Sequence, residues 1–281
     1  MKESFAVYSW DDIVSNKFPC EDAIFKSGFQ GTALSVGGFD GVHLGHQELL
    51  KKVLERKNLL PGVVTFSNLP ASFKNPSNYN GSVCTLQQKI EFFKGMGFCF
   101  VVVFDFYYEF GKMDGNKFLS ILKDCLSMRF MAEGTDFRCG YKGSFDIDKT
   151  AQFLTDNNIV LEKIAPVIID GERISSSLIR SAVLSGDIYK AGRFLGRPYS
   201  VDCSGFQWNK MQDENIICSD DIESVQVLPK DGVYNVSVVF NDQKQSELET
   251  TAEVVSGKIK LKLLQDDLCF ADGLKTVNFT V

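Results

Sequence analysis

The feature that most constrains the fold is an alternation of short apolar runs with amphipathic segments between about residues 31 and 196. Thr32–Val36, Gly62–Phe66 and Phe98–Phe104 are largely apolar, as strands are when both faces of a parallel sheet are covered. His46–Arg56 has its apolar residues at helical spacing. Because strands that alternate with helices form βα units, the pattern predicts an α/β domain with a parallel sheet.

Capping and stop residues predict further elements of this region. Thr85 and Gln88 have the spacing of a capping box and predict a helix that continues to Met96. Two helices are predicted near the end of this region, Ser176–Gly186 and Asp187–Gly196, and each stops at its glycine. Lys117–Leu126 is predicted as a further helix and Arg129–Glu133 as an extended segment.

The character of the chain changes after Pro198. Val233–Phe240 and Lys258–Leu264 alternate apolar and polar residues at strand period. Tight-turn pairs, such as Asn241-Asp242 and Asp272-Gly273, punctuate these alternating runs. We therefore predict two domains, 1–198 and 199–281, the second a small antiparallel β domain.

Composition limits the classes of protein that this chain can represent. Hydrophobic residues make up 44% and charged residues 23% of 281 residues, which is typical of a globular protein. The net charge of −6 argues against general affinity for nucleic acids or anionic membranes. No signal-peptide pattern is present, and no apolar run could cross a bilayer core of about 30 Å, so we predict a cytoplasmic protein. The eight cysteines form no C-x-x-C pair, which favours reduced thiols over a zinc site or disulfides.

Both histidines of the chain fall within one short stretch, Gly37-Gly-Phe-Asp-Gly-Val-His43-Leu-Gly-His46. The stretch lies where a predicted strand turns into a predicted helix. A glycine-rich turn lets the backbone approach a phosphate closely, and a helix N-terminus offers unpaired N–H groups and a positive dipole end. Two imidazoles at this place can donate hydrogen bonds to a phosphoryl group and its leaving group. The stretch therefore predicts a nucleotide-binding catalytic turn.

Several motifs resemble one family. Phe39-Asp-Gly-Val-His-Leu-Gly-His-Gln47 is similar to the F-D-G-V-H-x-G-H-Q form that prokaryotic FAD synthetases have within the nucleotidyltransferase superfamily. Ile174-Ser-Ser-Ser-Leu-Ile-Arg180 resembles the family's I-S-S-T-x-I-R, with serine at 177 in place of threonine. Glu133–Gly140 and Ala191–Tyr199 resemble two further family segments, whereas Ser67–Pro70 departs from the usual F-D-P-H-P.

The resemblance implies a Rossmann-like nucleotidyltransferase domain that transfers AMP from ATP to FMN, with Mg²⁺, and releases FAD and pyrophosphate. His43 and His46 are the implied catalytic residues, and no residue is assigned to a metal. The residues implied for ATP are Gly37, Gly38, Phe39, Asp40, Gly45, Ser175, Ser176, Ser177 and Arg180. The residues implied for FMN are Phe66, Asn68, Phe106, Phe110, Asp136 and Phe137.

The second domain resembles the family's riboflavin kinase β-barrel only in part. Leu228-Pro-Lys-Asp-Gly-Val-Tyr234 matches L-P-x-x-G-V-Y, but the stretch from Ser204 to Leu228 contains no G-F-P-T-A-N segment, and Lys258–Leu264 carries lysines where a catalytic glutamate belongs. We therefore expect the kinase activity to be absent. Three alternatives remain open: a bifunctional kinase and adenylyltransferase, a nucleotidyltransferase with another acceptor, and a non-catalytic flavin- or nucleotide-binding regulator. The sequence makes no prediction of oligomeric state.

Overall fold

A computed structural model of the chain describes residues 5–19, 24, 26–68, 79–105, 112–211, 215–220, 226–241, 246–263 and 273–280. The contacts divide the chain into two units. One comprises Met1–Tyr79 and Lys89–Arg173, and the other comprises Asn80–Gln88 and Ile174–Val281. The first strand of the second unit's sheet begins at Tyr199, and the domain boundary near 198 stays a prediction.

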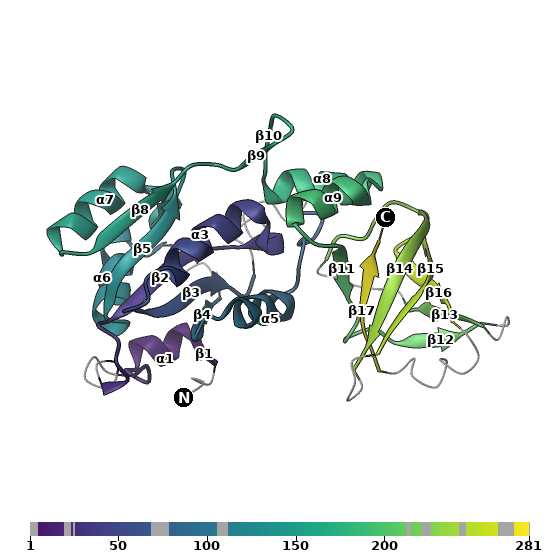
Figure 1. The fold of residues 1–281 in the computed structure, drawn as a ribbon, viewed down its shortest axis with the longest axis horizontal. Helices are drawn as coiled ribbons and strands as arrows, with labels where there is room; N and C mark the ends of the chain where they lie inside the picture. The colour runs from purple at the N-terminus through teal and green to yellow at the C-terminus, as the bar shows by residue number, and fades with distance from the viewer. Residues whose placement is uncertain are drawn as a thin grey trace. The chain divides into compact units, whose positions relative to one another are not determined.

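The first unit is built on a six-stranded sheet in the order β1-β4-β3-β2-β5-β8 (Figure 1). All neighbouring strands are parallel, which confirms the predicted α/β class. The strands are β1 (Ala6–Ser9), β2 (Thr32–Gly37), β3 (Leu60–Phe66), β4 (Phe100–Phe104), β5 (Met128–Gly134) and β8 (Val160–Ile164).

Helices pack on both faces of this sheet. They are α1 (Trp10–Val14), α3 (Leu44–Leu54), α5 (Leu86–Met96), α6 (Gly115–Cys125) and α7 (Ile147–Asp156). Short elements complete the unit: the 3-10 turns η1 (Asp40–Val42) and η4 (Tyr141–Gly143), and the strand pairs β6 (Arg138–Cys139) with β7 (Phe145–Asp146) and β9 (Ile168–Ile169) with β10 (Glu172–Arg173).

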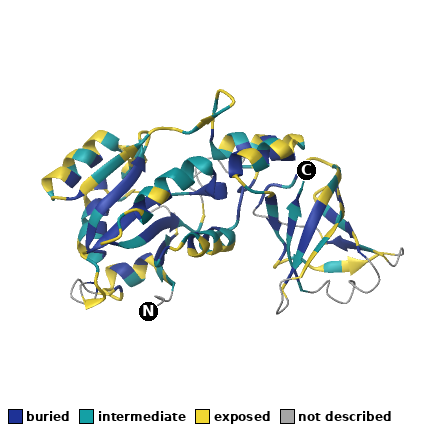
Figure 2. Ribbon diagram, viewed as in Figure 1, coloured by how far each residue is buried: buried dark blue, intermediate teal, exposed yellow. Residues whose placement is uncertain are grey.

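The core lies in two layers because successive strand residues point to opposite faces of the sheet. Ala33 of β2 joins a cluster that contains Leu50 of α3 and Phe93 of α5. Leu34, the next residue, joins a cluster that contains Trp10 of α1 and residues of α6. The buried residues therefore follow the strands of the sheet (Figure 2).

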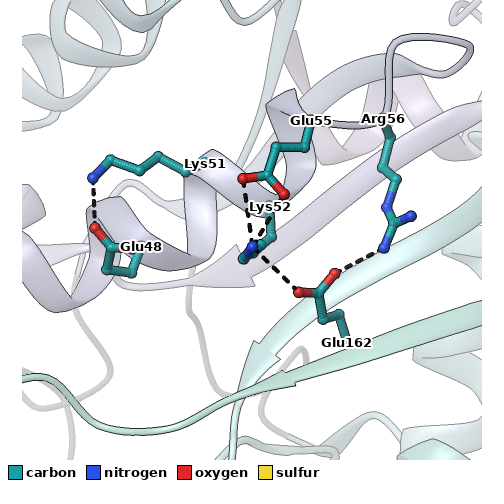
Figure 3. A network of polar contacts seen from close by, with 6 residues as sticks. All are labelled: Glu48, Lys51, Lys52, Glu55, Arg56 and Glu162. Carbon is teal, nitrogen blue, oxygen red and sulfur yellow. Dashed lines mark hydrogen bonds and ion pairs between the residues drawn. The ribbon is translucent and has the colours of Figure 1, made fainter.

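The C-terminal end of α3 is held by ion pairs with β8 (Figure 3). Glu162 accepts from Arg56 at 2.7 Å and lies 3.7 Å from Lys52, which also pairs with Glu55 at 3.1 Å. The Arg56 guanidinium lies 4.2 Å from the centre of the Phe130 ring. Because these charges are partly exposed, each pair contributes little to stability.

The second unit contains a seven-stranded antiparallel sheet in the order β11-β17-β14-β15-β16-β13-β12, which confirms the predicted second fold class. The strands are β11 (Tyr199–Asp202), β12 (Trp208–Lys210), β13 (Ile216–Ser219), β14 (Gly232–Phe240), β15 (Glu247–Val255), β16 (Lys258–Lys262) and β17 (Leu274–Phe279). Two helices precede the sheet in the chain, α8 (Ser176–Ser185) and α9 (Ile188–Leu195). Both end at glycines with positive φ, Gly186 at 84° and Gly196 at 73°, as the stop signals predicted.

Two differences from the sequence expectations affect the site. The predicted helix at His46 begins two residues earlier, at Leu44, because His43 itself is its N-cap. An additional edge strand, β1, precedes the predicted βα units and pairs with β4. None of the described helices is long and apolar enough to span a membrane.

Candidate active site

The glycine-rich turn leaves the sheet at its topological switch point. β2 pairs with β3 on one side and with β5 on the other. The connection that leaves the carboxyl end of β2 leads to β3, and the one that leaves β5 leads to β8, so the two run to opposite sides. In open parallel sheets, ligands bind beyond the carboxyl ends of the strands at such a point. Gly37 ends β2, and α3 begins seven residues later at Leu44.

The backbone of the turn adopts a conformation that L-residues rarely take. Phe39, Gly41 and Val42 have φ values of 46°, 79° and 39°. Two of these are not glycine, and a positive φ at such residues costs free energy that the surrounding structure must supply. Phe39 and Val42 are buried, and the apolar cluster around them keeps the strained turn in place.

His43 has a structural role in addition to its predicted chemical role. Its side chain accepts a hydrogen bond from the backbone N–H of His46, with 3.3 Å between N and Nδ1, and thereby caps α3. Because Nδ1 is the acceptor, the proton of the neutral ring lies on Nε2. A Cβ on Gly45 would lie 3.2 Å from the His43 ring, so the glycine of the motif provides the space that this ring occupies.

His46 stacks on His43 and is held in its neutral form. The two ring centres are 3.6 Å apart and the rings are inclined by 17°, while Phe39 meets His46 edge-on at 5.3 Å. Nδ1 of His46 is buried and has no hydrogen-bond partner. Burial, then the neighbouring His43 and Lys89, hold the pKa of His46 well below its usual range. If the proton of the neutral ring lies on Nε2, the buried Nδ1 leaves only a lone pair without a partner, which costs less than an unpaired N–H group. We therefore assign the donor role of this imidazole to Nε2 as well.

Lys89 is a buried part of this region that the sequence analysis did not identify. Only 3% of the residue is exposed, although lysine is almost never buried without partners. Its ammonium donates to the carbonyl oxygens of Phe66 at 2.8 Å and Gly38 at 3.1 Å, and to Oγ1 of Thr65 at 3.3 Å. A lysine on an amphipathic helix gives no local signal of such a position.

Glu133, at the end of β5, is the second buried ionisable residue that sequence reasoning missed. Its Oε1 accepts from the backbone N–H of Val36 at 2.6 Å and from the hydroxyl of Ser35 at 3.5 Å. Burial raises the pKa of Glu133 well above its usual range, and these two hydrogen bonds oppose the rise. The side chain therefore joins the carboxyl ends of β5 and β2.

The serine motif begins a helix of the second unit. Ser175 is the N-cap of α8 and accepts from the backbone N–H of Leu178 at 3.2 Å. Ser176 and Ser177 occupy the first turn, and Nε of Arg180 donates to the carbonyl oxygen of Gly81 at 2.7 Å. The N-cap role is therefore present, and the predicted contact of these residues with ATP stays a prediction.

The residues predicted for FMN have different environments. Phe66 and Phe137 are partly buried against the same apolar cluster, and Phe66 meets Phe104 edge-on at 4.2 Å between ring centres. Asn68 is exposed, as is Asp136, which pairs with Arg173. Phe106 and Phe110 lie outside the described residues. The assignment of all six to FMN stays a prediction.

The described part of the chain offers no preformed metal site. No group of three or more His, Cys, Asp or Glu side chains within them could hold a metal ion. Magnesium commonly binds through one or two carboxylates together with substrate phosphates. Asp40 of η1 is the acidic residue within the glycine-rich turn, and it is buried.

A helix that begins at the switch point of a parallel sheet, with imidazoles in its first turn, presents donors to a phosphate. This arrangement defines the class of Rossmann-like nucleotidyltransferase domains, followed in this chain by an antiparallel β domain. A model of the FAD synthetase family matches residues 26–178, more than half of the chain. The chain therefore belongs to the FAD synthetase family.

Curated relatives agree with this assignment. A protein from Buchnera aphidicola (subsp. Schizaphis graminum) is 31% identical over 185 residues, which are 64% of this chain and 59% of that protein. A protein from Haemophilus influenzae is 31% identical over 220 residues, which are 74% of this chain and 70% of that protein. Both are named bifunctional riboflavin kinase/FMN adenylyltransferase.

A solved structure shares the fold. The crystal structure of a protein from Streptococcus pneumoniae that is named a macrolide-efflux protein superposes with a TM-score of 0.75 and 20% identity. The match covers 90% of this chain and 86% of that one. At this identity the likeness shows that the α/β and antiparallel β parts follow the same fold, and it carries no statement about activity.

Proposed function

We propose that this protein is an FMN adenylyltransferase, which transfers the AMP part of ATP to the phosphate of FMN and releases pyrophosphate. The observation that carries the proposal is the stacked pair His43 and His46 at the N-terminus of α3, where His43 accepts at Nδ1 from the backbone of His46. This leaves Nε2 as the donor atom that we assign to both rings. Membership of the FAD synthetase family supports the choice of FMN as acceptor.

The proposed reaction is a direct transfer of the adenylyl group, with no covalent intermediate on the protein. A phosphate oxygen of FMN attacks the α-phosphorus of ATP, and the bond from this phosphorus to the oxygen that bridges to the β-phosphate breaks. FAD and pyrophosphate are the products. The attacking phosphate is already an anion, so no general base is required, and the demand on the protein is to position two anions and stabilise the transition state.

The histidines meet this demand as hydrogen-bond donors. The Nε2–H groups of His43 and His46 donate to oxygens of the α-phosphoryl group and the leaving pyrophosphate as negative charge develops there. Backbone N–H groups at the start of α3 add the positive end of the helix dipole. Gly37 and Gly38 allow the chain to approach the nucleotide, and Phe39, Asp40 and Gly45 are the other residues of the turn in our ATP assignment.

The serine motif is proposed to bind the same nucleotide. Ser175, Ser176 and Ser177 offer hydroxyls, and Arg180 offers a guanidinium whose planar fork suits phosphate oxygens. Mg²⁺ bound to ATP would neutralise charge on the triphosphate. For FMN, we propose that Phe66, Phe137, Phe106 and Phe110 contribute to the ring site.

The second unit is proposed to lack riboflavin kinase activity. Strand β16 carries Lys258, Lys260 and Lys262 at alternate positions, where relatives are expected to have an acid, and the G-F-P-T-A-N segment is absent from the sequence. The names of the curated relatives favour the alternative, a bifunctional enzyme. We keep 1–198 as the proposed adenylyltransferase domain and 199–281 as the proposed kinase-like domain.

One experiment tests both parts. The purified protein is incubated with Mg-ATP and either FMN or riboflavin, and the flavins are separated by chromatography. We expect FAD from FMN and no FMN from riboflavin. FMN production from riboflavin would identify a bifunctional enzyme, and conversion of another acceptor but not FMN would identify a different nucleotidyltransferase. FMN binding without release of pyrophosphate would identify a regulator.

These substrates also indicate the setting of the reaction. ATP and flavin nucleotides are the proposed small-molecule partners, with no nucleic acid among them, and the cytoplasm is the proposed location. The acidic net charge of −6 supports the exclusion of nucleic acid.

A further inference from the structure

The buried ionisable side chains of this protein gather at one place. Among the described residues, the acidic, basic and histidine side chains that are buried are Asp40, His43, Lys89 and Glu133. Asp40 and His43 follow β2, Glu133 ends β5, and Lys89 binds the carbonyl oxygen of Gly38. Buried ionisable groups are costly, and their concentration in one region is typical of a functional site.

We propose that Lys89 is a positioning residue of the adenylyl-transfer site, which braces the glycine-rich turn against the end of β3 and places a positive charge near His46. The proposal rests on the proposed function for its effect on turnover. Its effects on the turn and on His46 are properties of the protein without substrate.

The hydrogen bonds of Lys89 begin where the backbone ladder ends. The register between β2 and β3 runs to the pair Gly37 and Thr65. The next residues on the two chains, Gly38 and Phe66, both turn their carbonyl oxygens to the Lys89 ammonium, at 3.1 and 2.8 Å. The buried ammonium of Lys89 thus joins Gly38, the first residue of the turn, to Phe66, the last residue of β3. The two carbonyl oxygens are both acceptors and could not bond to each other.

Lysine is suited to this position for a chemical reason. An ammonium group has three N–H donors and no acceptor, and the three oxygens that surround it are acceptors of Gly38, Phe66 and Thr65. The hydroxyl of Thr65 donates its own proton to the carbonyl oxygen of Gly37 at 2.9 Å, so Oγ1 is an acceptor toward Lys89. An uncharged aliphatic side chain at position 89 would leave these oxygens without the donor.

The positive charge of Lys89 also acts on His46. Burial is the largest cause of the lowered pKa of His46, and the neighbouring His43 and the charge of Lys89 act in the same direction. Protonation of His46 would create a second cation near Lys89 and would put a proton on a buried Nδ1 that has no acceptor. Buried Asp40 on η1 and Glu133 on β5 are the acidic groups in this region, and they do not reverse that direction.

The test replaces Lys89 with methionine, which has a similar unbranched shape and no charge. Lys94→Met is the matched control, because Lys94 lies on the same helix and is exposed. The chain has only two histidines, so their ring protons can be followed separately by NMR as pH is varied. FAD synthesis from FMN and Mg-ATP is measured over the same pH range.

We expect the pKa of His46 to rise in Lys89→Met and to stay at its original position in Lys94→Met. Turnover should fall by about 100-fold in Lys89→Met, the effect of a displacement on the order of 1 Å at a reacting centre. The acid limb of the remaining activity should move to higher pH, because His46 becomes protonated more readily. A merely structural role for Lys89 would lower the amount of folded protein without moving this limb.

Two further variants keep the proposal refutable if Lys89→Met does not fold. Lys89→Gln removes the charge but keeps an N–H donor, and Lys89→Arg keeps the charge but alters the fit. The pKa of His46 should rise in the first and stay low in the second. An unchanged His46 titration in a folded uncharged variant, or wild-type turnover in it, would overturn the proposal. If the wild-type protein makes no FAD, the proposed function fails, while the NMR titration still decides the role of Lys89.

Discussion

His43 combines a cap and a donor in one ring, and two substitutions can separate these roles. His43→Ala removes both the hydrogen bond that the ring accepts from the His46 backbone and the proposed Nε2–H donor. His43→Asn restores an oxygen that can cap α3, since asparagine is among the best N-cap residues. Asparagine does not reproduce the imidazole donor at its place above the turn.

The expected stability difference follows from the geometry of the cap. Loss of an N-cap costs about 0.5–2 kcal/mol, and the N-to-Nδ1 distance of 3.3 Å is long for a hydrogen bond. We therefore expect His43→Ala to be less stable than His43→Asn by about 0.5–1 kcal/mol. Both variants lose the ring that stacks on His46, so their difference isolates the cap. It corresponds to a difference in Tm of about 1–4 °C.

Thermal unfolding and FAD synthesis measure the two effects independently. Turnover should fall by about 10²–10³-fold in both variants, the usual effect of removing one transition-state donor. Full turnover in His43→Ala would refute the catalytic assignment. Equal stability of the Ala and Asn variants would refute the capping argument, and recovery of turnover in His43→Asn would show that the cap, rather than the donor, supports the reaction.

Three further predictions concern other parts of the chain. Arg180→Lys should not restore the ATP dependence of FAD synthesis that Arg180→Ala loses, because lysine lacks the planar fork; steady-state kinetics with ATP as the varied substrate checks this. Burial raises the pKa of Glu133 in the folded protein. The contribution of this carboxyl to the free energy of unfolding is therefore complete below its unfolded-state pKa of about 4.3, and it is lost as pH rises through the folded-state pKa. The free energy of unfolding of Glu133→Gln should therefore increase relative to that of the wild type as pH rises. Urea unfolding at several pH values measures this difference. Gly62→Ala should destabilise the protein by about 1–3 kcal/mol, because its Cβ would lie 2.1 Å from the Phe100 ring; Gly95→Ala, where the Cβ meets open space, is the control, and equal stability of the two would contradict the packing argument.

Much of the fold could be predicted because its signals are local. The apolar runs at β2, β3 and β4 and the glycines after α8 and α9 each constrain a few neighbouring residues. The edge strand β1 was missed because four residues that alternate in burial form too short a pattern. Its place beside β4 is decided by pairing with residues more than ninety positions away in the sequence.

The sequence by itself determined the catalytic motif, since His43, Gly45 and His46 lie within one helical turn and their relation follows from the helix alone. Only the tertiary structure decided their environment. Lys89 reaches Gly38 across 51 residues of sequence, and Glu133 reaches Val36 across 97. A charged side chain on a helix or at a strand end is predicted from sequence to be exposed, because burial of a charge is unfavourable unless partners compensate for it. Here the carbonyl and N–H groups left free where parallel strands end are those partners, and they come together only when the sheet has formed.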